Sequence, residues 1–434
     1  MSDSKCLEFN PLDLERLSTE EAKALDQLRQ RFDDDVMTHR SFVGDKHYLI
    51  HWLKARKYDV DQAEAMLRNH LKFRDAMKLD DFELVAEKIN PVMAKYYTRG
   101  HFGVSKAGHP VVYFPFGVID PKGLVYSVKQ SDCFFAILAW QEERRLNCIN
   151  VSSKLHKKIQ QVIYILDLKG IGTKHLWMPA LQVFQQIARM VEQHTPELIY
   201  KLKIINAPNL FHTLFQMVKP MLDANTLRKI QVFGSDGWKE GLLQEIDADQ
   251  LPVYYGGTAV GKDGDEKCED SIRYGGEVPK ELYWTEEQKA DLVPIGSTLQ
   301  ELSIARGAQV QLLVNLSHSA AKLYWYFESA SSRDLGFAVY RVPMETAQAH
   351  VASDSDRRLL LSPDEQFATD SLPMVFPYFR LATDIVPEWN ELTTREPTSY
   401  LLLFDNSYSW LHSKTIRYCV SVTESDESSG FAGK

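Results

Sequence analysis

The sequence lacks several features that would assign it to a specialised class of protein. Its 434 residues have a formal net charge of -9, which argues against nucleic acid as the main partner and against simple electrostatic adhesion to anionic membranes. Its apolar runs, such as residues 134–140, are far too short to span a bilayer. The first residues include Asp3, Lys5 and Glu8 without a continuous apolar stretch, which predicts no secretory signal.

Cysteine is also scarce. The five cysteines are odd in number and widely scattered, without the paired spacing of a metal site. This pattern favours a reducing compartment, and we expect a cytoplasmic protein that contacts membranes only transiently. The sequons at Asn150 and Asn315 are therefore interpreted as chance matches.

Motifs of nucleotide-binding and catalytic proteins are incomplete. After Gly170 and Gly172, His175 occupies the position of the third glycine of a dinucleotide fingerprint. A phosphate-loop-like stretch, residues 256–262, is followed by Asp263 where a magnesium-binding hydroxyl is needed. The sequence thus predicts no catalytic residue, no metal site and no cofactor, and single histidines such as His175 and His194 are interpreted as surface or capped side chains.

What is present indicates two or three domains, since the chain is too long for a single core. From Thr19 to about Lys78 the apolar spacing predicts helices, and Asp61 lies where one could start. Strand-like and helix-like segments then alternate, which predicts a mainly parallel sheet covered by helices. The predicted strands are residues 111–116, 162–168, 203–207 and 230–234.

The last third of the chain changes to a period of two. Val310, Leu312 and Val314 recur with this period, as do Ile416 and the apolar residues that follow it, which predicts antiparallel strands in a β-sandwich. Residues 256–269 are rich in glycine and charge and are predicted to form a linker.

An apolar segment, residues 210–221, lies between two of the predicted strands. Its apolar residues recur at spacings of three and four, which predicts an amphipathic helix with a broad apolar face. Pro208 and Pro220 interrupt the chain at its two ends, so the helix could be hinged. It is interpreted either as a crossover helix packed on the sheet or as a gate over a lipid cavity, where methionine and phenylalanine adapt to varied apolar partners.

These segments resemble a known family. The runs INAPNLF and PVYYGG resemble the lipid-exchange helix and closing strand of the Sec14-like (CRAL-TRIO) lipid-binding family. YLIHWLKARKYDV resembles its N-terminal signature, YILDLKGIG its central strand, and the last portion a GOLD β-sandwich. This order is that of the animal Sec14-like proteins, which include tocopherol-associated and squalene-transfer members.

The resemblance implies a division of the chain into an N-terminal α-helical region, an α/β lipid-binding domain and an all-β sandwich. We expect a helical region at 1–92, a CRAL-TRIO domain at 93–257, a linker at 258–275, a GOLD-like β-sandwich at 276–423 and a tail at 424–434. Because the linker offers little that could pack, the sandwich is predicted to be a separable module.

The resemblance also implies a head-group site for phosphatidylinositol. A buried phosphate needs fixed cations and hydroxyl donors. The matching positions are Arg56, Lys57, Glu197, Thr226 and Lys229. The alternative is a surface ion pair between Glu197 and Lys229 and a solvated helix end at Arg56 and Lys57.

A second, apolar ligand is expected because the chain departs from the phosphatidylcholine-binding members. Val162 and Tyr164 stand where those members have small hydroxyl residues, which leaves room for a tocopherol, a retinoid or a squalene-like molecule. Each candidate wall or gate residue could equally belong to the core. The candidates are Phe134, Leu176, Leu181, Phe184, Leu210, Phe211, Phe215, Met217 and Met221.

The sequence therefore predicts a lipid-binding and lipid-transfer protein that needs no reaction and no cofactor other than the bound lipid. Its partners would be an apolar lipid, phosphatidylinositol, a membrane during exchange and a protein bound by the sandwich. One alternative is a lipid-sensing adaptor that recruits a partner through the sandwich. Another, less favoured, is an enzyme that acts on a lipid ester or a nucleotide.

Overall fold

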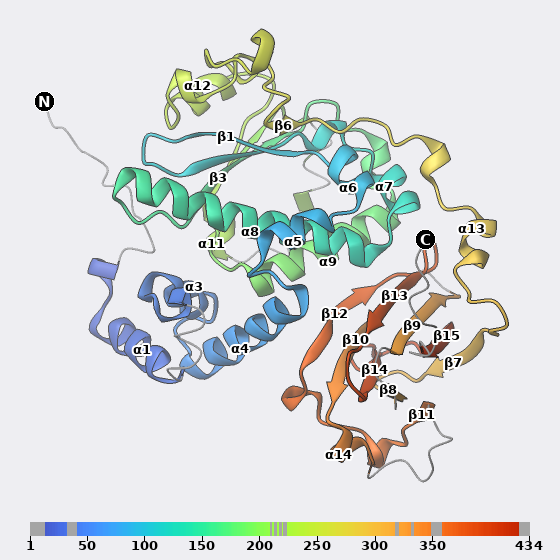
Figure 1. Cartoon of the computed structure of the whole chain (residues 1–434). Coiled ribbons are helices and arrows are strands. Elements are labelled where there is room, and N and C mark those ends of the chain that lie inside the picture. Colours follow the sequence, from blue (N-terminus) through green and yellow to red (C-terminus); the bar gives the residue numbers. More distant parts are fainter. Residues whose placement is uncertain are drawn as a thin grey trace, which may run out of the picture.

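The protein consists of N-terminal helices, a helix-covered sheet and a C-terminal β-sandwich (Figure 1), which confirms the predicted fold class. The computed structural model describes residues 14–32, 41–208, 211, 215–216, 219, 224–316, 321–330, 334–348 and 358–424. The predicted tail after Glu424 lies outside these residues. Within the described ranges, no helix combines the length and apolar character needed to cross a membrane.

The N-terminal helices begin at side chains that cap them. Ser18 and Glu21 form a capping box on α1, and Asp45 accepts a hydrogen bond from the first turn of α3. Asp59, not the predicted Asp61, is the N-cap of α4, where it accepts from the amide of Gln62. The helices are α1 (Thr19–Gln30), α3 (Lys46–Ala55), α4 (Val60–Met77), α5 (Phe82–Glu87) and α6 (Pro91–Tyr96).

The central sheet has the strand order β5-β4-β3-β2-β1-β6. Strands β2 to β5 are parallel, β1 pairs antiparallel with β2, and the edge strand β6 pairs antiparallel with β1. The strands are β1 (Arg99–Val104), β2 (Pro110–Phe114), β3 (Val162–Asp167), β4 (Ile199–Ile205), β5 (Ile230–Val232) and β6 (Ile272–Arg273). The helices of this part are α7 (Pro121–Ser127), α8 (Gln130–Leu155), α9 (Met178–His194), α11 (Ala224–Arg228) and α12 (Trp238–Leu243).

The linker predicted at 258–275 is wrong, because this segment packs on the sheet. Cys268 and Ile272 are fully buried beside Tyr255, and β6 is the edge strand that pairs with β1. Position 257 requires glycine, because a Cβ atom there would lie 1.9 Å from the carbonyl oxygen of Leu251. The glycines of this stretch form tight turns, and composition alone does not distinguish a stretch of tight turns from a linker.

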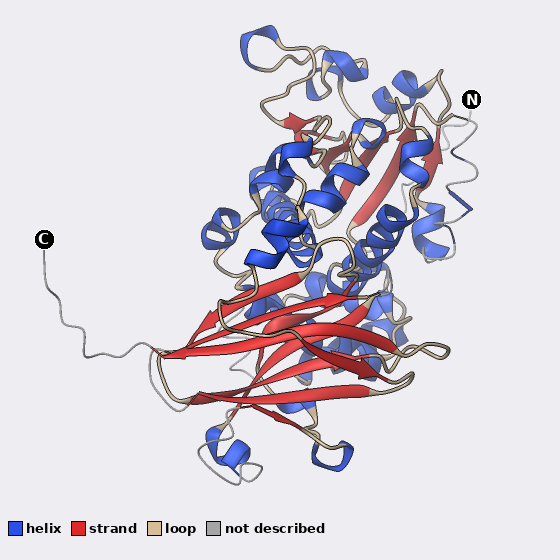
Figure 2. Ribbon diagram, turned by 90° about the vertical axis from the view of Figure 1, so that its right-hand side faces the viewer, coloured by secondary structure: helices blue, strands red, loops and turns tan. Residues whose placement is uncertain are grey.

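The C-terminal part is a sandwich of two antiparallel sheets, visible as stacked strands in Figure 2. The sheets are β11-β8-β14-β10-β12 and β13-β9-β15-β7, and large aromatic side chains such as Trp325, Phe337 and Phe404 fill the space between them. The strands are β7 (Gln300–Ile304), β8 (Gln309–Leu316), β9 (Ala321–Ser329), β10 (Leu335–Val342), β11 (Arg358–Leu360), β12 (Met374–Leu381), β13 (Glu388–Thr393), β14 (Thr398–Asp405) and β15 (Lys414–Glu424). The helices α13 (Glu286–Asp291) and α14 (Met344–Gln348) complete the chain.

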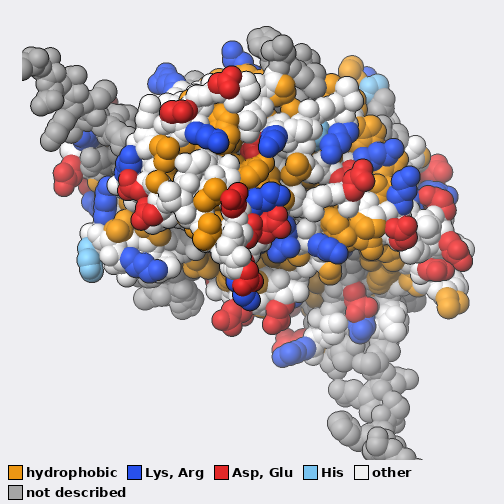
Figure 3. Space-filling model, turned by 90° about the horizontal axis from the view of Figure 1, so that it is seen from above, with side chains coloured by type: hydrophobic (Ala, Val, Ile, Leu, Met, Phe, Trp, Pro, Cys, Tyr) orange, Lys and Arg blue, Asp and Glu red, His pale blue; other side chains and the backbone are white. Residues whose placement is uncertain are grey.

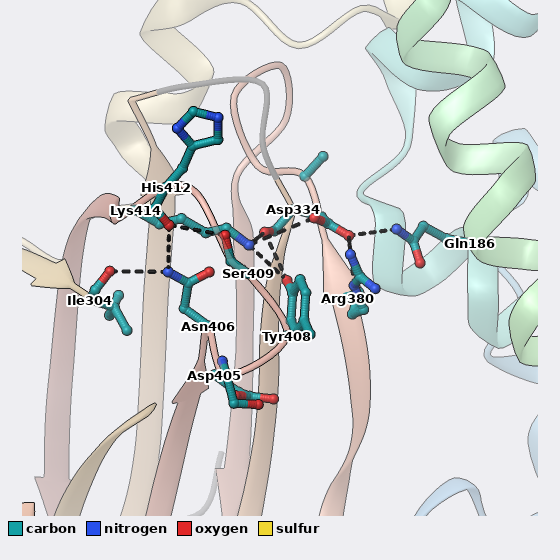
Figure 4. A network of polar contacts seen from close by, with 12 residues as sticks. Gln186, Ile304, Asp334, Arg380, Asp405, Asn406, Tyr408, Ser409, His412 and Lys414 are labelled. Atoms are coloured by element: carbon teal, nitrogen blue, oxygen red, sulfur yellow. Dashed lines mark hydrogen bonds and ion pairs between the residues drawn. The ribbon is translucent and has the colours of Figure 1, made fainter. Parts of the chain in front are cut away.

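The sandwich shares a hydrophobic core with the rest of the protein. Phe379 of β12 contacts Phe73 of α4 and Phe134 of α8, at ring-centroid distances of 5.8 and 5.2 Å. On another side, Gln186 of α9 donates to the Asp334 carboxylate at 2.6 Å (Figure 4). These contacts oppose the prediction of a separable module, which rested on linker composition and had no information about the faces of the domains.

Truncation of Phe379 tests the shared core. Because its ring is buried between helices and sandwich, Phe379→Ala should lower the free energy of unfolding by about 3 kcal/mol. Denaturant unfolding should show a single transition that moves as a whole, followed by circular dichroism and by tryptophan fluorescence. Two separate transitions, with the helical one unchanged, would contradict a shared core.

A buried carboxyl group lies in this interface. Glu388 of β13 is 1% exposed, and its nearest cation is Lys129, 3.7 Å away. Among the described residues, neither carboxyl oxygen has a hydrogen-bond partner, because the Lys129 ammonium donates to the carbonyl of Trp389. Burial therefore raises the pKa of Glu388 to about 7.

The raised pKa predicts a pH dependence of stability. Between the ordinary carboxyl pKa of 4.5 and about 7, the native state keeps a proton that the unfolded state releases. The stabilisation is complete below 4.5 and is lost as the pH rises through 7. Glu388→Gln should remove this slope and unfold at pH 8 with a free energy about 3 kcal/mol above the wild type. Parallel pH profiles of the two proteins in denaturant unfolding would show that Glu388 does not titrate in this range.

Candidate functional site

A cavity of about 900 Å³ lies between the sheet and helix α9. Side chains alternate along β3, so Tyr164 and Leu166 line the cavity while Ile163 and Ile165 are buried in the packed interior. Strands β2 and β4 contribute Phe114, Leu202 and Ile204 to the same wall. The sheet therefore supplies one long apolar side of the cavity.

Helix α9 supplies the opposite side. Its residues Leu181, Phe184, Ala188 and Val191 recur at spacings of three and four and line the cavity. Gln186, between them in sequence, bonds to the sandwich instead. One helix thus separates the cavity from the sandwich along much of its length.

Cationic side chains gather at one end of the cavity, here called the cationic end and formed by Lys54, Lys57, Arg228 and Lys229. The Lys229 ammonium lies 2.8 Å from the Glu197 carboxylate, and the two side chains are only 10% and 9% exposed. Burial lowers the pKa of Lys54, and the nearby Glu197 opposes this effect.

The backbone at the cationic end is unusual. The backbone φ angles of Lys57, Tyr58 and Glu197 are 51°, 63° and 56°. They lie in the left-handed region that residues other than glycine rarely adopt. All three residues line the cavity. Such backbone costs of order 1 kcal/mol each and concentrates at functional sites.

The structure brings four of the five predicted head-group residues to the cavity wall: Lys57, Glu197, Thr226 and Lys229. Arg56 lies outside the wall, and its guanidinium donates to the carbonyl of Ala55. The prediction missed Lys54, Tyr58 and Arg228. Lys54 lies in the last turn of α3 and Lys57 just beyond the end of that helix, so their common position at the cavity follows from the left-handed turn and not from helical spacing.

The predicted apolar wall is distributed between cavity, core and residues outside the described chain. Leu181, Phe184, Phe211 and Phe215 line the cavity. Phe134 is 1% exposed and belongs to the core beside Phe379, so its assignment to the wall is wrong. Helical spacing does not distinguish a core residue from a cavity residue. Leu176 lies outside the wall, and Leu210, Met217 and Met221 lie outside the described residues.

Phe211 and Phe215 form an aromatic pair in the wall. Their ring centroids are 5.4 Å apart, and both side chains are half-buried. They come from the segment predicted to be the gate, and the structure describes only part of that segment.

The far end of the cavity is closed by residues from two parts of the chain. Pro121 and Leu124 of α7 lie there with Val128 and Gln130, the last at the start of α8. Residues 382–386, between β12 and β13 and here called the sandwich loop, complete this end. No pattern in the sequence indicates that a sandwich loop reaches the cavity.

Polar groups beside the apolar walls are held uncharged. Burial raises the pKa of the Cys133 thiol, which lines the cavity, to about 12, so this cysteine is a weak nucleophile. His175, predicted to be a surface or capped side chain, is 2% exposed and lines the cavity, and its Nδ1 accepts a hydrogen bond from the amide of Gly172 at 3.1 Å, which confirms the capped alternative. His194 is also buried, stacked on Phe73 at 3.8 Å, and burial lowers its pKa to about 3. Both rings therefore contribute to packing.

The fold and the cavity define an α/β domain with an apolar cavity between its sheet and helix α9. Residues 94–257 match the family model of the CRAL/TRIO domain, close to the range 93–257 expected from the sequence. The chain contains this domain, and its resemblance to the Sec14-like family is confirmed. The matched range does not reach the sandwich, whose all-β architecture fits the GOLD expectation without testing it.

Two known proteins illustrate the similarity. Protein ctg-1 of Caenorhabditis elegans is 25% identical over 381 residues, which cover 87% of this chain and 91% of that protein. The crystal structure of Sfh5 is 14% identical, covers 62% of this chain and 92% of its own, and superposes with a TM-score of 0.41.

Charged substitutions of the aromatic pair test whether it faces an accessible site. Because Phe211 and Phe215 are half-buried at the cavity, Phe211→Asp with Phe215→Asp should leave the melting temperature within a few degrees of the wild type. Lipid movement between labelled and unlabelled vesicles should fall by at least tenfold. Normal transfer would exclude a gate role, and loss of folding would place the pair in the core.

Proposed function

We propose that this protein binds an apolar lipid or phosphatidylinositol in its cavity and transfers it between membranes without catalysing a reaction. One observation supports this most directly: a cavity of about 900 Å³ is apolar along its length and cationic at one end. Protein cavities of this size accommodate large ligands, and a lipid with an anionic head matches both the walls and the end. We further propose that the protein is cytoplasmic and meets membranes only during exchange.

The cationic end supplies what a phosphate head group requires. Lys54, Arg228 and Lys229 provide ammonium and guanidinium donors, and Thr226 provides a hydroxyl. Charge-assisted hydrogen bonds of this kind are the strong ones in partly buried sites. Glu197 holds the Lys229 ammonium at the cavity wall and could in turn accept from inositol hydroxyls.

The apolar walls favour a second ligand class, of tocopherol, retinoid or squalene type. Tyr164 and Leu166 place bulky apolar surface on the central strand where small hydroxyl groups are absent. Removal of apolar surface from water contributes ~25 cal/mol per Å², which offsets the cost of extraction from a bilayer. Membrane contact must be local, because acidic and basic side chains are interspersed on the face shown in Figure 3.

A second candidate function is a lipid-sensing adaptor that recruits a protein partner through the sandwich. The observation that favours it is the sandwich loop in the cavity wall, which would let the sandwich respond to the ligand. A sensor would exchange lipid slowly and form stable complexes, whereas a carrier would exchange it rapidly.

Removal of two donors tests the head-group site. Lys229→Ala with Thr226→Val removes a charge and a hydroxyl while the apolar walls stay intact. A charge-assisted contact commonly contributes ~1.5 to 3 kcal/mol, so phosphatidylinositol affinity should fall by about tenfold to a hundredfold. Binding of a neutral lipid such as tocopherol or squalene should stay within about twofold in the same titration.

Arg56 offers a matched control for this experiment. Arg56→Ala removes a cation of the same helix end that lies outside the cavity wall, and it should leave both affinities unchanged. Lys57→Ala, within the wall, should weaken phosphatidylinositol alone. Equal losses for both ligand classes, or a larger effect at Arg56 than at Lys57, would contradict the head-group site.

A further inference from the structure

The far end of the cavity is built by a segment distant in sequence from the lipid-binding domain. Ala382, Asp384, Ile385 and Val386 of the sandwich loop line the same cavity as the residues of β3 and α9. They lie more than a hundred residues beyond position 257, where the CRAL/TRIO match ends. The cavity is therefore incomplete without the sandwich.

Chain direction places the sandwich loop opposite the cationic end. Helix α8 leads by a short connection into β3, so its first residue, Gln130, lies where the parallel strands finish. Helix α9 returns from that end to the start of β4, next to Glu197. Its wall residues Ala180 and Val191 are about three turns apart, ~16 Å along the axis. In Figure 1, α7 lies on the side of the sandwich and α11 toward the N-terminal helices.

The sandwich loop is held in place by hydrogen bonds on both sides. The amide of Ala382 donates to the Gln130 side-chain carbonyl at 2.5 Å, and Lys129 donates to the carbonyl of Trp389 at 2.7 Å. The first bond joins the start of the loop to helix α8, and the second joins β13, the strand that follows the loop, to the residue before that helix. These contacts fix the loop against the start of helix α8.

Helix α9 is fixed to the same sandwich through Asp334 (Figure 4). The Asp334 carboxylate accepts from Gln186 at 2.6 Å and from Arg380 at 2.8 Å, and its backbone carbonyl accepts from the Tyr408 hydroxyl at 2.9 Å. The sandwich therefore positions one long wall of the cavity as well as its end.

We propose that the sandwich loop is the end stop of the ligand site, so that the β-sandwich selects ligands by the length of their apolar tail. This inference rests on the proposed lipid-binding function. A head group at the cationic end directs its tails along β3 and α9 toward Ala382, Ile385 and Val386. A tail longer than this distance would have to fold back or leave part of its length outside the cavity.

The chemistry of the loop agrees with an apolar terminus. Ala382, Ile385 and Val386 offer only hydrocarbon, whereas the fourth wall residue of the loop, Asp384, is an exposed residue that carries a carboxyl group. An anionic group at this end would lose hydration and would meet no cation in the loop. The loop therefore accepts a methyl-terminated acyl or isoprenoid chain.

Two substitutions of Ile385 change the length of the site in opposite directions. Ile385→Trp shortens it, and Ile385→Ala lengthens it. Binding is measured with two pairs of probes: phosphatidylinositol with eight-carbon or eighteen-carbon chains, and the isoprenoids farnesol and squalene. Each methylene that loses burial weakens binding by about fourfold, so Ile385→Trp should weaken the long member of each pair by about tenfold or more. The short member should change less than twofold.

Ile385→Ala should leave the short members unchanged and bind phosphatidylinositol with twenty-two-carbon chains at least threefold more tightly than the wild type. Leu360→Trp is the matched control, because Leu360 is 50% exposed on β11 and lies outside the cavity wall. It should change no affinity. Thermal unfolding establishes that each variant folds. If Ile385→Trp does not fold, the chain-length preference of Ile385→Ala alone tests the end stop.

The outcomes separate this inference from the function on which it rests. If the wild type binds no member of either pair, the proposed function fails. If it binds them and the Ile385 variants keep the wild-type preference for chain length, or weaken short and long members equally, the end stop is overturned. A change of preference in opposite directions for the two variants supports it.

Discussion

A large apolar cavity between the central sheet and helix α9 is the constraint on which the rest of this structure depends. Walls that face a void lose the dispersion contacts that a packed core would give them, so stability must come from the surroundings. Here the surroundings are unusually well tied together. The Arg74 guanidinium, 2% exposed, lies 2.8 Å from the buried Glu142 carboxylate and joins α4 to α8. The shared core around Phe379 then joins both helices to the sandwich.

Four of the six strands in the central sheet could be predicted from the sequence. Strands β2 to β5 are parallel and rich in β-branched residues, and the sequence pattern identified all four, including β5 at the edge of the sheet. Strand β1 reads RGHFGV and has neither apolar alternation nor an apolar run, and β6 is only two residues long. Both strands form because they pair with adjacent strands of the sheet, and such tertiary pairing leaves no local pattern in the sequence.

The site could be predicted only where resemblance and local chemistry agreed. Lys57, Glu197, Thr226 and Lys229 matched a family pattern, and the fold brings them to one end of the cavity. Phe134 has the spacing of a wall residue, yet the docking of Phe379 makes it core. The left-handed backbone at Lys57, Tyr58 and Glu197 has no sequence signal, since no glycine or asparagine occupies these positions. The position of the sandwich loop at the cavity could not be predicted either, because it arises only when two parts distant in sequence pack together.

The shared wall connects the two candidate functions through one free-energy cycle. A ligand whose tail contacts the sandwich loop stabilises the docked sandwich, because it binds that arrangement better than any in which the loop has moved away. By linkage, a protein that binds only the docked sandwich must raise the affinity for the ligand by the same factor. The ordering of the loop by Gln130 and of α9 by Asp334 makes the docked arrangement dominant without a ligand, so the coupling factor is small. A small factor suits a carrier, whose ligand must also leave. A sensor would need the polar contacts at Gln130 and Asp334 to be weaker than this structure shows.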